Sequence, residues 1–566
     1  MTKRRVTSFG LGLLGCFGFA VTASAAGIQA GDDAPWDRRH AAHLLARAGF
    51  GGPPAQIDAL VELGRDGAVG SLLDYASTPR NDEPYPRGTM PARPPRRMMA
   101  GFDDDAKRML RNVYRRNTRQ HMEAVGQWWL RRMMITNRPL EEKMTLFWHG
   151  HFTSGFREVK QWQFMYDQNE LLREHALGDF KTLLVAISKD PAMLRYLDNA
   201  NNVKRKPNEN YARELMELFT LGEGNYTEKD VKEAARALTG WGLGHDGFQF
   251  KRRQHDDGKK DFLGRVGNFD GEDIISIILE QPAASRYLAR RLWTFFAYRD
   301  PEPEVVEELA RVLRDSDFSI RAALRAMLRS DAFYSDRALS TQIKSPIDVV
   351  VGSVRRLEIE PQNIRGMFQA ARQMGQALFQ PPNVKGWDGG RTWITTNTLF
   401  TRYNFAGQLL EGMGQNERNR RGKKQAARPL AQADAKKGGE PGEMAFAGPQ
   451  GKRIRAMLDD LPDEQAERIR TSMRQMRPPK ILAGRQQPYD PMPTLERYNL
   501  ETPEQIVRHY VGRLIQGDVP KDKLDVLIEV LSPQGRPLNR DAKQQTARRV
   551  REMIFLIMSM PEYQLI

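Results

Sequence analysis

Two histidines one residue apart, His149 and His151, lie in the aromatic sequence FWHGHF. In a strand the two rings would share one face, and in a loop Gly150 would let them converge, so either geometry suits a metal ion or a proton-transfer pair. The preceding residues, RPLEEKMTLFW, show helical periodicity, which places the pair at a helix end beside Trp148 and Phe152. Aromatic packing with hydrogen bonds to backbone carbonyls is the alternative.

A second candidate site lies in NENYARELMELFTLG, where Asn210, Glu214 and Glu217 are spaced by four and three residues. On a helix this spacing puts two carboxylates and an amide on one side. Such a side can bind a hard cation or divide the roles of acid and base. The alternative is a solvated face on which Arg213 neutralises Glu209 and Glu217 one turn away.

Histidines and aspartates also surround a predicted β-hairpin formed by GFQFK (247–251) and KDFLG (260–264). Loops commonly hold functional groups, and imidazole with carboxylate suits zinc, iron or manganese. Solvated turn residues are the equal alternative. The side chains concerned are His245, Asp246, His255, Asp256 and Asp257.

A glycine- and proline-rich loop, FQPPNVKGWDGGRTW (379–393), places two indoles among hydrogen-bonding groups. Aromatic faces flanked by polar groups are what a sugar ring needs. A buried loop whose tryptophans hold helices together is the alternative. The candidate substrate-binding residues are Trp387, Trp393, Asn383, Lys385, Asp388 and Arg391, together with Asn210 of the second site.

The elements that position these residues are mainly helical, because apolar residues recur every three and four positions along most of the chain. The sequence of residues 36–410 predicts one large helical domain. The sequence of residues 503–566 predicts helices that pack back on that domain. Residues 414–493 begin with a Gly-, Gln- and Lys-rich run and predict a disordered basic insertion. Two stretches near 287–334 and 506–565 share a helix, a Pro-containing turn and further helices, which predicts two similar modules.

The N-terminus predicts export. MTKRR precedes an apolar run and then ASAA, the three regions of a signal peptide, with cleavage after Ala25. The chain's single cysteine, Cys16, also allows an outer-membrane lipoprotein as the lesser alternative to a periplasmic or extracellular protein. Cleavage at Ala25 removes it, so a metal must be held by His, Asp, Glu or Asn. No later run of eighteen apolar residues predicts a transmembrane span.

The charge balance favours polyanions as partners. There are 87 Lys and Arg against 71 Asp and Glu, a formal net charge of +16. Acidic glycans, anionic lipid and nucleic acid would all be attracted. The sequence has no zinc-finger, helix-turn-helix or RNA-binding signature, so nucleic acid is not the expected partner.

Several long motifs together resemble the bacterial family catalogued as domain of unknown function 1800 (DUF1800). They are WHGHF, NENYARELMELFTLG, HDDGKKDFLGRVGNFDG, LARRLWTFF, IKSPIDVVVGSVR and MGQALFQPPNVKGWDGGRTWITTNTL. The resemblance covers 36–410 and resumes at 503. It implies an exported, mostly helical protein, commonly encoded beside a second exported family, DUF1501, which resembles sulfatases and alkaline phosphatases. It implies no established activity.

We therefore expect an exported protein that acts on extracellular, anionic polysaccharide as a hydrolase or lyase dependent on a divalent transition metal. The predicted metal ligands are His149, His151, His255 and Asp256. The predicted catalytic residues are Glu214, His149, His151 and Glu217, with Trp387 and Trp393 as the substrate platform. The alternative is a non-enzymatic secreted partner that binds or assembles with the DUF1501-type sulfatase-like protein.

Overall fold

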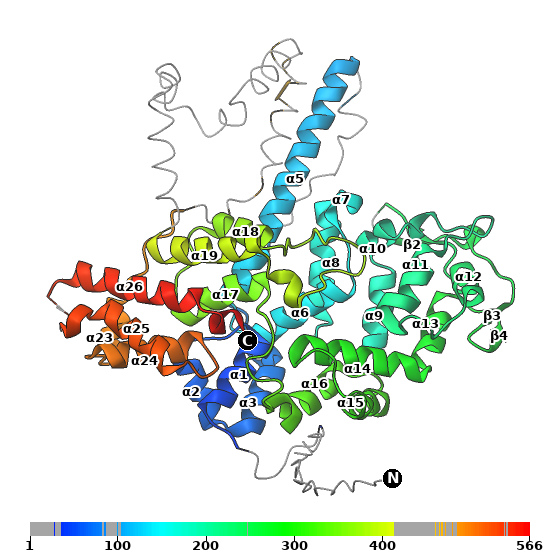
Figure 1. The fold of residues 1–566 in the computed structure, drawn as a ribbon. Coiled ribbons are helices and arrows are strands. Elements are labelled where there is room, and N and C mark those ends of the chain that lie inside the picture. Colours follow the sequence, from blue (N-terminus) through cyan, green and yellow to red (C-terminus); the bar gives the residue numbers. More distant parts are fainter. Residues whose placement is uncertain are drawn as a thin grey trace, which may run out of the picture.

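Helices make up most of the chain, whose architecture is seen in a computed structural model (Figure 1). The predicted class, mainly α, is confirmed: within the described residues the sheets are two antiparallel pairs of short strands. The predicted signal peptide 1–25 with Cys16, Asp246 and most of the predicted insertion 414–493 lie outside the described residues. Those residues are 28, 35–81, 84–86, 99, 103–245, 247–412, 459, 463, 466–467, 470, 478, 481, 484–536, 538 and 541–566.

One hydrophobic core joins the N-terminal helices to the middle of the chain, in the lower and right-hand parts of Figure 1. Its elements are α1 (Arg38–Gly49), α2 (Pro54–Glu62), α3 (Gly64–Leu73), η1 (Tyr75–Ser77), α6 (Pro139–His151), α9 (Phe180–Ser188), α10 (Pro191–Tyr196), η2 (Asn199–Asn201), α11 (Glu209–Glu214), η3 (Leu215–Thr220), α12 (Glu228–Ala237), α13 (Gly271–Leu279), α14 (Pro282–Phe296), α15 (Pro303–Asp315), α16 (Ile320–Arg329) and η5 (Asp331–Tyr334). Leu44, Trp148 and Leu292 are fully buried in it.

A second core joins the long helix α5 to the C-terminal part of the chain. Its elements are α5 (Asp104–Ile135), α7 (Phe156–Val159), α8 (Trp162–Glu174), α17 (Pro346–Leu357), α18 (Ile364–Gln373), α19 (Thr396–Glu411), α23 (Met492–Arg497), α24 (Pro503–Leu514), α25 (Lys521–Leu531), η8 (Pro533–Gly535), α26 (Lys543–Ser559) and η9 (Glu562–Gln564). The turn η6 (Gly390–Trp393) precedes α19. Helix α26 packs on α19, and α24 packs on α17.

The local sequence explains where these helices begin. Thr227 and Ser345 each cap a helix through a capping box, in which the side chain three residues later also binds the cap backbone. Proline occupies the first position of α6, α14 and α17, where its missing N–H costs no helical hydrogen bond. Helices α15 and α16 keep their buried residues on one stripe, so they cover the core from outside.

The two predicted strands are present, but the predicted pairing between them is wrong, because each pairs with a further strand that the sequence did not indicate. Strand β2 (Phe248–Phe250) pairs with β1 (Trp241–Leu243), and β3 (Lys260–Phe262) pairs with β4 (Arg265–Gly267). The turn η4 (Arg252–Gln254) follows β2. Each pair joins strands that are neighbours along the chain, and Gly264 at a φ of 79° allows the tight turn between β3 and β4.

The two predicted similar modules have the same order of elements. The first is α14, α15, α16 and η5, and the second is α24, α25, α26 and η9, with η8 between the last two helices. Each ends in a buried tyrosine, Tyr334 in the first core and Tyr563 in the second. No helix among the described residues is long and apolar enough to cross a membrane.

Helices α6 and α17 lie at the contact between the two cores and are buried on every side. Every residue of α17 is buried, and in α6 all but Pro139 and Gly150 are buried. Phe147 of α6 belongs to the first core and Leu146 to the second. A helix buried all round has no polar face to set its rotation, so its orientation depends on specific contacts.

The charge of Glu142 supplies such a contact in α6. One carboxylate oxygen accepts from Arg132 Nε at 2.6 Å and Arg173 Nε at 2.7 Å. The other accepts from Trp129 Nε1 at 2.9 Å and Arg173 Nη2 at 3.0 Å. Burial opposes ionisation, but Arg173 and Arg132 hold the pKa of Glu142 below its usual value. This network fastens α6 to both α5 and α8.

We expect Glu142→Gln to lower the free energy of unfolding by about 3–5 kcal/mol, because it removes the buried carboxylate that two buried guanidinium groups share. Urea unfolding followed by circular dichroism measures the loss. Glu170→Gln is the matched control: Glu170 binds the same Arg173 at 2.7 Å but its side chain is 33% exposed. That variant should lose less than about 1 kcal/mol, and equal losses in the two variants would contradict this account.

Candidate functional site

Both histidines of FWHGHF lie in the last turn of α6. Consecutive α-helical residues are rotated by about 100°, so side chains two positions apart point in nearly opposite directions. His149 faces Trp129 and Phe379, whose ring centroids lie 5.2 and 5.1 Å away. His151 instead stacks on Phe147 with centroids 5.8 Å apart. The two rings therefore do not converge on one ion.

Each histidine is buried, hydrogen-bonded and neutral. Nε2 of His149 accepts a hydrogen bond from the Phe379 N–H at 3.1 Å, and Nε2 of His151 donates to the Phe219 carbonyl at 3.0 Å. Burial lowers the pKa of His149 to about 4. Burial, and then the charge of Arg291, lower the pKa of His151 well below 6.5. These contacts are those of the packing alternative.

The other two predicted metal ligands have protein partners of their own. Nδ1 of His255 lies 2.9 Å from the Thr239 carbonyl, and Asp256 accepts from Arg236 Nε at 2.8 Å. Over the part of the chain that the structure describes, no three His, Cys, Asp or Glu side chains are grouped so that they could hold a metal ion. The four predicted ligands therefore do not fit a metal centre, and we derive no chemistry through a metal.

The carboxylates Glu214 and Glu217 lie at an irregular point of the fold, where α11 passes into the π-helical turn η3. In this turn the Leu221 and Gly222 N–H groups both reach the Met216 carbonyl, at 2.7 and 3.0 Å. π-Helical turns are rare and frequently occur at functional sites. Both carboxylates are half-buried, so they remain accessible while the apolar side of η3 lies in the core.

The surroundings of Glu214 favour its protonated form. Burial raises its pKa, and the charge of Glu217 raises it further, while Arg213 and Lys385 act in the opposite direction. Glu217 accepts a hydrogen bond from the Tyr226 hydroxyl at 3.2 Å. Two neighbouring carboxyl groups in unlike surroundings are able to divide the roles of proton donor and proton acceptor.

The remaining groups on α11 are engaged in structure. Arg213 binds Glu228 at 2.7 Å and Glu209 at 3.4 Å. Glu217, which the alternative interpretation pairs with Arg213, accepts a hydrogen bond from the Tyr226 hydroxyl. Asn210 donates to the Leu197 carbonyl at 3.2 Å. Asn210 thus ties α11 to the end of α10, and its side chain is used in a backbone contact.

The loop 379–393 is held directly against the end of α6. Phe379 bonds to His149 through its N–H and to the Phe156 N–H through its carbonyl, at 2.9 Å. Gly386 has a φ of +81°, and a Cβ there would lie 2.7 Å from the Gly150 carbonyl oxygen. Only a glycine permits this approach, so FWHGHF and NVKGW form one packed unit.

The two indoles of the loop have different environments. Trp393 is 7% exposed and lies below the loop, as the packing alternative predicts. Trp387 is half-buried, with its ring centroid 5.7 Å from that of His149. The exposed polar side chains of the loop are Asn383, Lys385, Asp388 and Arg391. Trp387 is therefore the indole that can contact a ligand.

Three of these polar residues have defined contacts. Asn383 accepts from the Lys385 N–H at 2.9 Å, and the Lys385 ammonium lies 3.9 Å from a carboxylate oxygen of Glu223. The Asp388 carbonyl accepts from Arg299. Lys385 is near enough to lower the pKa of Glu214, so the structure brings together the second and fourth predicted clusters. The first predicted cluster, which contains His149, packs against the loop 379–393 from beneath. The hairpin cluster, which contains His255 and Asp256, is not part of this group.

Two tyrosines near the carboxylates have no role in the sequence-based interpretation. Burial, and then the charges of Glu158 and Glu214, raise the pKa of Tyr196 to about 12. Burial, and then Glu217, raise the pKa of Tyr226 to about 12. The sequence gave one indication of a role for Tyr226, which stands in the motif that follows η3. Tyr226 is nine positions from Glu217, however, and this is not a helical spacing that would predict their contact.

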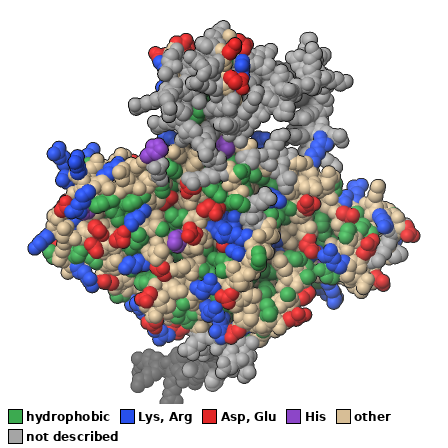
Figure 2. Space-filling model, turned by 180° about the vertical axis from the view of Figure 1, so that it is seen from behind, with side chains coloured by type: hydrophobic (Ala, Val, Ile, Leu, Met, Phe, Trp, Pro, Cys, Tyr) green, Lys and Arg blue, Asp and Glu red, His purple; other side chains and the backbone are tan. Residues whose placement is uncertain are grey.

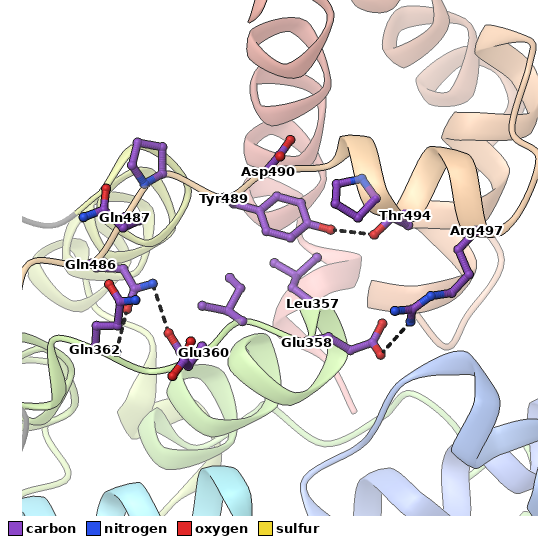
Figure 3. A pocket seen from close by; sticks show the side chains of 13 residues that line it. Leu357, Glu358, Glu360, Gln362, Gln486, Gln487, Tyr489, Asp490, Thr494 and Arg497 are labelled. Carbon is purple, nitrogen blue, oxygen red and sulfur yellow. Dashed lines mark hydrogen bonds and ion pairs between the residues drawn. The ribbon is translucent and has the colours of Figure 1, made fainter. Parts of the chain in front are cut away.

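Two open pockets are lined by other residues. One of about 520 Å³ is lined by Arg80, Arg138, Glu141 and Glu170, among others, and its charges pair with one another. Another, of about 270 Å³, lies between the end of α17 and residues 486–497 (Figure 3). There Gln486 donates to the Glu360 carbonyl at 3.2 Å. No predicted site residue lines either of these two pockets.

One comparison with known proteins gives a match. A family model described as a protein of unknown function (DUF1800) matches residues 43–565. The chain belongs to this family, as its motifs predict. No curated protein and no solved structure matches it.

Protonation of the two histidines generates a pH dependence. In the unfolded chain both take up protons near pH 6.5, whereas the folded-state pKa of His149 is about 4. Stability is therefore full above pH 6.5 and should fall as the pH is lowered from 6.5 toward 4. We expect His149→Gln to be less stable than wild type near neutral pH but to depend less steeply on pH in this window. Urea midpoints measured across the window test this, and parallel curves would contradict it.

Proposed function

We propose that the protein is an exported, acid–base enzyme that cleaves a glycan at the surface between η3 and the loop 379–393. The observation on which this depends is the carboxyl pair: Glu214, with a raised pKa, stands beside Glu217 and within electrostatic reach of Lys385. Cleavage of glycosidic bonds commonly uses two carboxyl groups in unlike surroundings. The partly exposed indole of Trp387 supports a sugar ring as the ligand.

The roles follow from the surroundings of each group. Glu214 retains a proton to higher pH than an ordinary glutamate and gives it to the leaving glycosidic oxygen. Glu217 is the acceptor in its hydrogen bond with Tyr226, so it acts as the carboxylate that activates water or stabilises the sugar cation. Lys385 binds hydroxyl groups of the substrate at the other side. His149 fixes the loop backbone through the Phe379 N–H.

Local charge favours a neutral glycan over the anionic one that the net charge predicts. Three carboxylates, those of Glu158, Glu217 and Glu223, act on Tyr196, Glu214 or Lys385 in this region. The opposing charges that act on Glu214 are those of Arg213 and Lys385. On the face shown in Figure 2, Lys and Arg side chains lie among Asp and Glu side chains and do not gather in one patch. The formal charge of +16 is thus a property of the whole chain.

Export rests on the sequence of the first 25 residues, which resembles a signal peptide. A protein delivered to the periplasm or the cell exterior meets polysaccharide there, which fits the proposed substrate class. A secreted binding partner for a DUF1501-type sulfatase-like protein is the competing function, and the same experiment separates the two.

The test is release of reducing ends from a panel of neutral, amino and acidic glycans by the purified mature chain. We expect Glu214→Gln to reduce cleavage by about 10²–10⁴-fold, the usual contribution of a general acid. Activity of the wild type should fall as the pH rises through the raised pKa of Glu214, because the proton donor is then lost. Trp387→Ala should weaken substrate binding more than turnover.

Glu209→Gln is the matched control, because Glu209 lies one turn earlier on the same helix and binds Arg213 in an exposed pair. It should retain wild-type activity. If no glycan is cleaved, and Glu214→Gln, Trp387→Ala and wild type bind the panel alike, the proposal is wrong and the binding-partner function gains.

A further inference from the structure

Five cationic side chains surround Asp348 in the interior, and we call them the Asp348 cation cluster. Each is no more than 4% exposed. They come from α1, α6, the residues before α17, α17 itself and α19, so the cluster lies at the junction of the two cores. Its members are Arg47, Lys143, Lys344, Arg356 and Arg402.

Asp348 is the only carboxylate among the described residues whose charge raises the pKa of any member of this cluster. Both of its oxygens are already used. One accepts from Lys143 Nζ at 2.6 Å, and the other accepts from the N–H and hydroxyl of Ser345 at 3.2 and 2.8 Å as part of the α17 cap. One carboxylate thus faces five cations, and no oxygen of it binds an arginine.

The three guanidinium groups of Arg47, Arg356 and Arg402 have N–H donors that no acceptor among the described residues uses. Arg47 gives one N–H to the Ala338 carbonyl at 2.7 Å, and Arg402 gives two, to Gln564 and the Lys344 carbonyl, at 3.0 and 2.8 Å. Four buried nitrogens have no acceptor within the part of the chain that the structure describes: Nε and Nη1 of Arg47, Nη2 of Arg356 and Nε of Arg402.

Glycine makes the room for Arg356. A Cβ at Gly51 would lie 2.7 Å from its Nε, and a Cβ at Gly352 would lie 3.1 Å from its Nη1. The two glycines leave room for the buried guanidinium, and they are also required by the φ of +83° at Gly51 and by the Phe50 carbonyl, which would lie 3.0 Å from a Cβ at Gly352. The cluster is built into the fold and is not a chance burial of one long side chain.

Mutual repulsion runs through the whole cluster. Burial lowers the pKa of Lys143, and the charges of Arg47 and Arg356 lower it further. Burial, and then Arg356 and Arg402, act in the same direction on Lys344. Lysines can lose a proton in such surroundings, but arginines stay charged in proteins. Buried water can satisfy an N–H group, yet it leaves the charge in place, and an uncompensated buried charge is strongly unfavourable.

We propose that the Asp348 cation cluster binds a small oxyanion, sulfate or phosphate, inside the folded protein. Guanidinium groups match the several acceptor oxygens of such an ion, and their free donors supply its hydrogen bonds. The anion joins α1, α17 and α19 and so ties the two cores together. This site is separate from the Glu214 surface, and its failure or success leaves the proposed function untouched.

Two measurements on the full mature chain test the site. In the first, protein equilibrated with sulfate or phosphate is desalted and denatured, and ion chromatography measures the released anion. We expect close to one anion per wild-type chain and a clear loss in Arg356→Met and Arg402→Met. Wild-type protein that releases neither anion would overturn the proposal, whether or not the variants fold.

In the second, thermal unfolding is followed as sodium sulfate or sodium phosphate is raised through the millimolar range, where general salting-out effects are small. Binding to the native state alone raises the melting temperature with the logarithm of anion concentration. Wild type should show this rise, and Arg356→Met should not. In anion-free buffer, Arg356→Met should melt at or above the wild-type temperature, because it removes an unpaired buried charge.

Arg355→Met is the matched control. Arg355 is the neighbouring buried arginine, but it donates to the carbonyls of Gly51 and Thr136 at 2.9 and 3.0 Å. Its loss should lower the melting temperature at every anion concentration and leave the rise with sulfate or phosphate intact. Equal anion dependence in Arg356→Met and wild type, or dependence on sodium chloride alone at the same ionic strength, would overturn an oxyanion site.

Discussion

The buried charges of one turn of α6 are the constraint on which the rest of the structure depends. Glu142 binds Arg132 of α5 and Arg173 of α8, and the next residue, Lys143, binds Asp348 of α17. Because α6 and α17 are buried all round, apolar contacts alone would leave their rotation poorly fixed. The ion pairs set that rotation. It points His149 toward the loop 379–393 and so determines where the candidate site can be.

Much of the architecture could be predicted from the sequence, and the failures have physical causes. Helical periodicity and capping residues indicate most helices, because those signals are local. The prediction of which strands pair was wrong, because the pairing of short strands depends on the turns between them, and the sequence indicates those turns only weakly. The charges Glu142, Lys143 and Asp348 look like solvent-facing residues in the sequence. Their burial depends on partners up to 205 positions away, which no local pattern reveals.

The candidate site shows the same division. Glu214 and Glu217 could be found from their helical spacing, and Trp387 and Lys385 from the composition of their loop. Their convergence could not, since it depends on Gly386 approaching the Gly150 carbonyl. The metal hypothesis for His149 and His151 rested on a strand or loop, whereas the helix continues through both residues and separates them. Helix geometry thus decides between ligand and packing roles for a His-x-His pair.

The short segment Tyr563–Ile566 is bound to residues that lie far earlier in the sequence. Its backbone pairs with Gln342 and Lys344, the Tyr563 carbonyl accepts from the Lys344 ammonium, and the Tyr563 hydroxyl bonds to Ser353. The two contacts of Tyr563 span 219 and 210 positions of sequence. Contacts between such distant residues form late and slowly in folding. A chain cut before Tyr563 would lose these contacts and leave the Lys344 ammonium and the Ser353 hydroxyl without this partner in the interior.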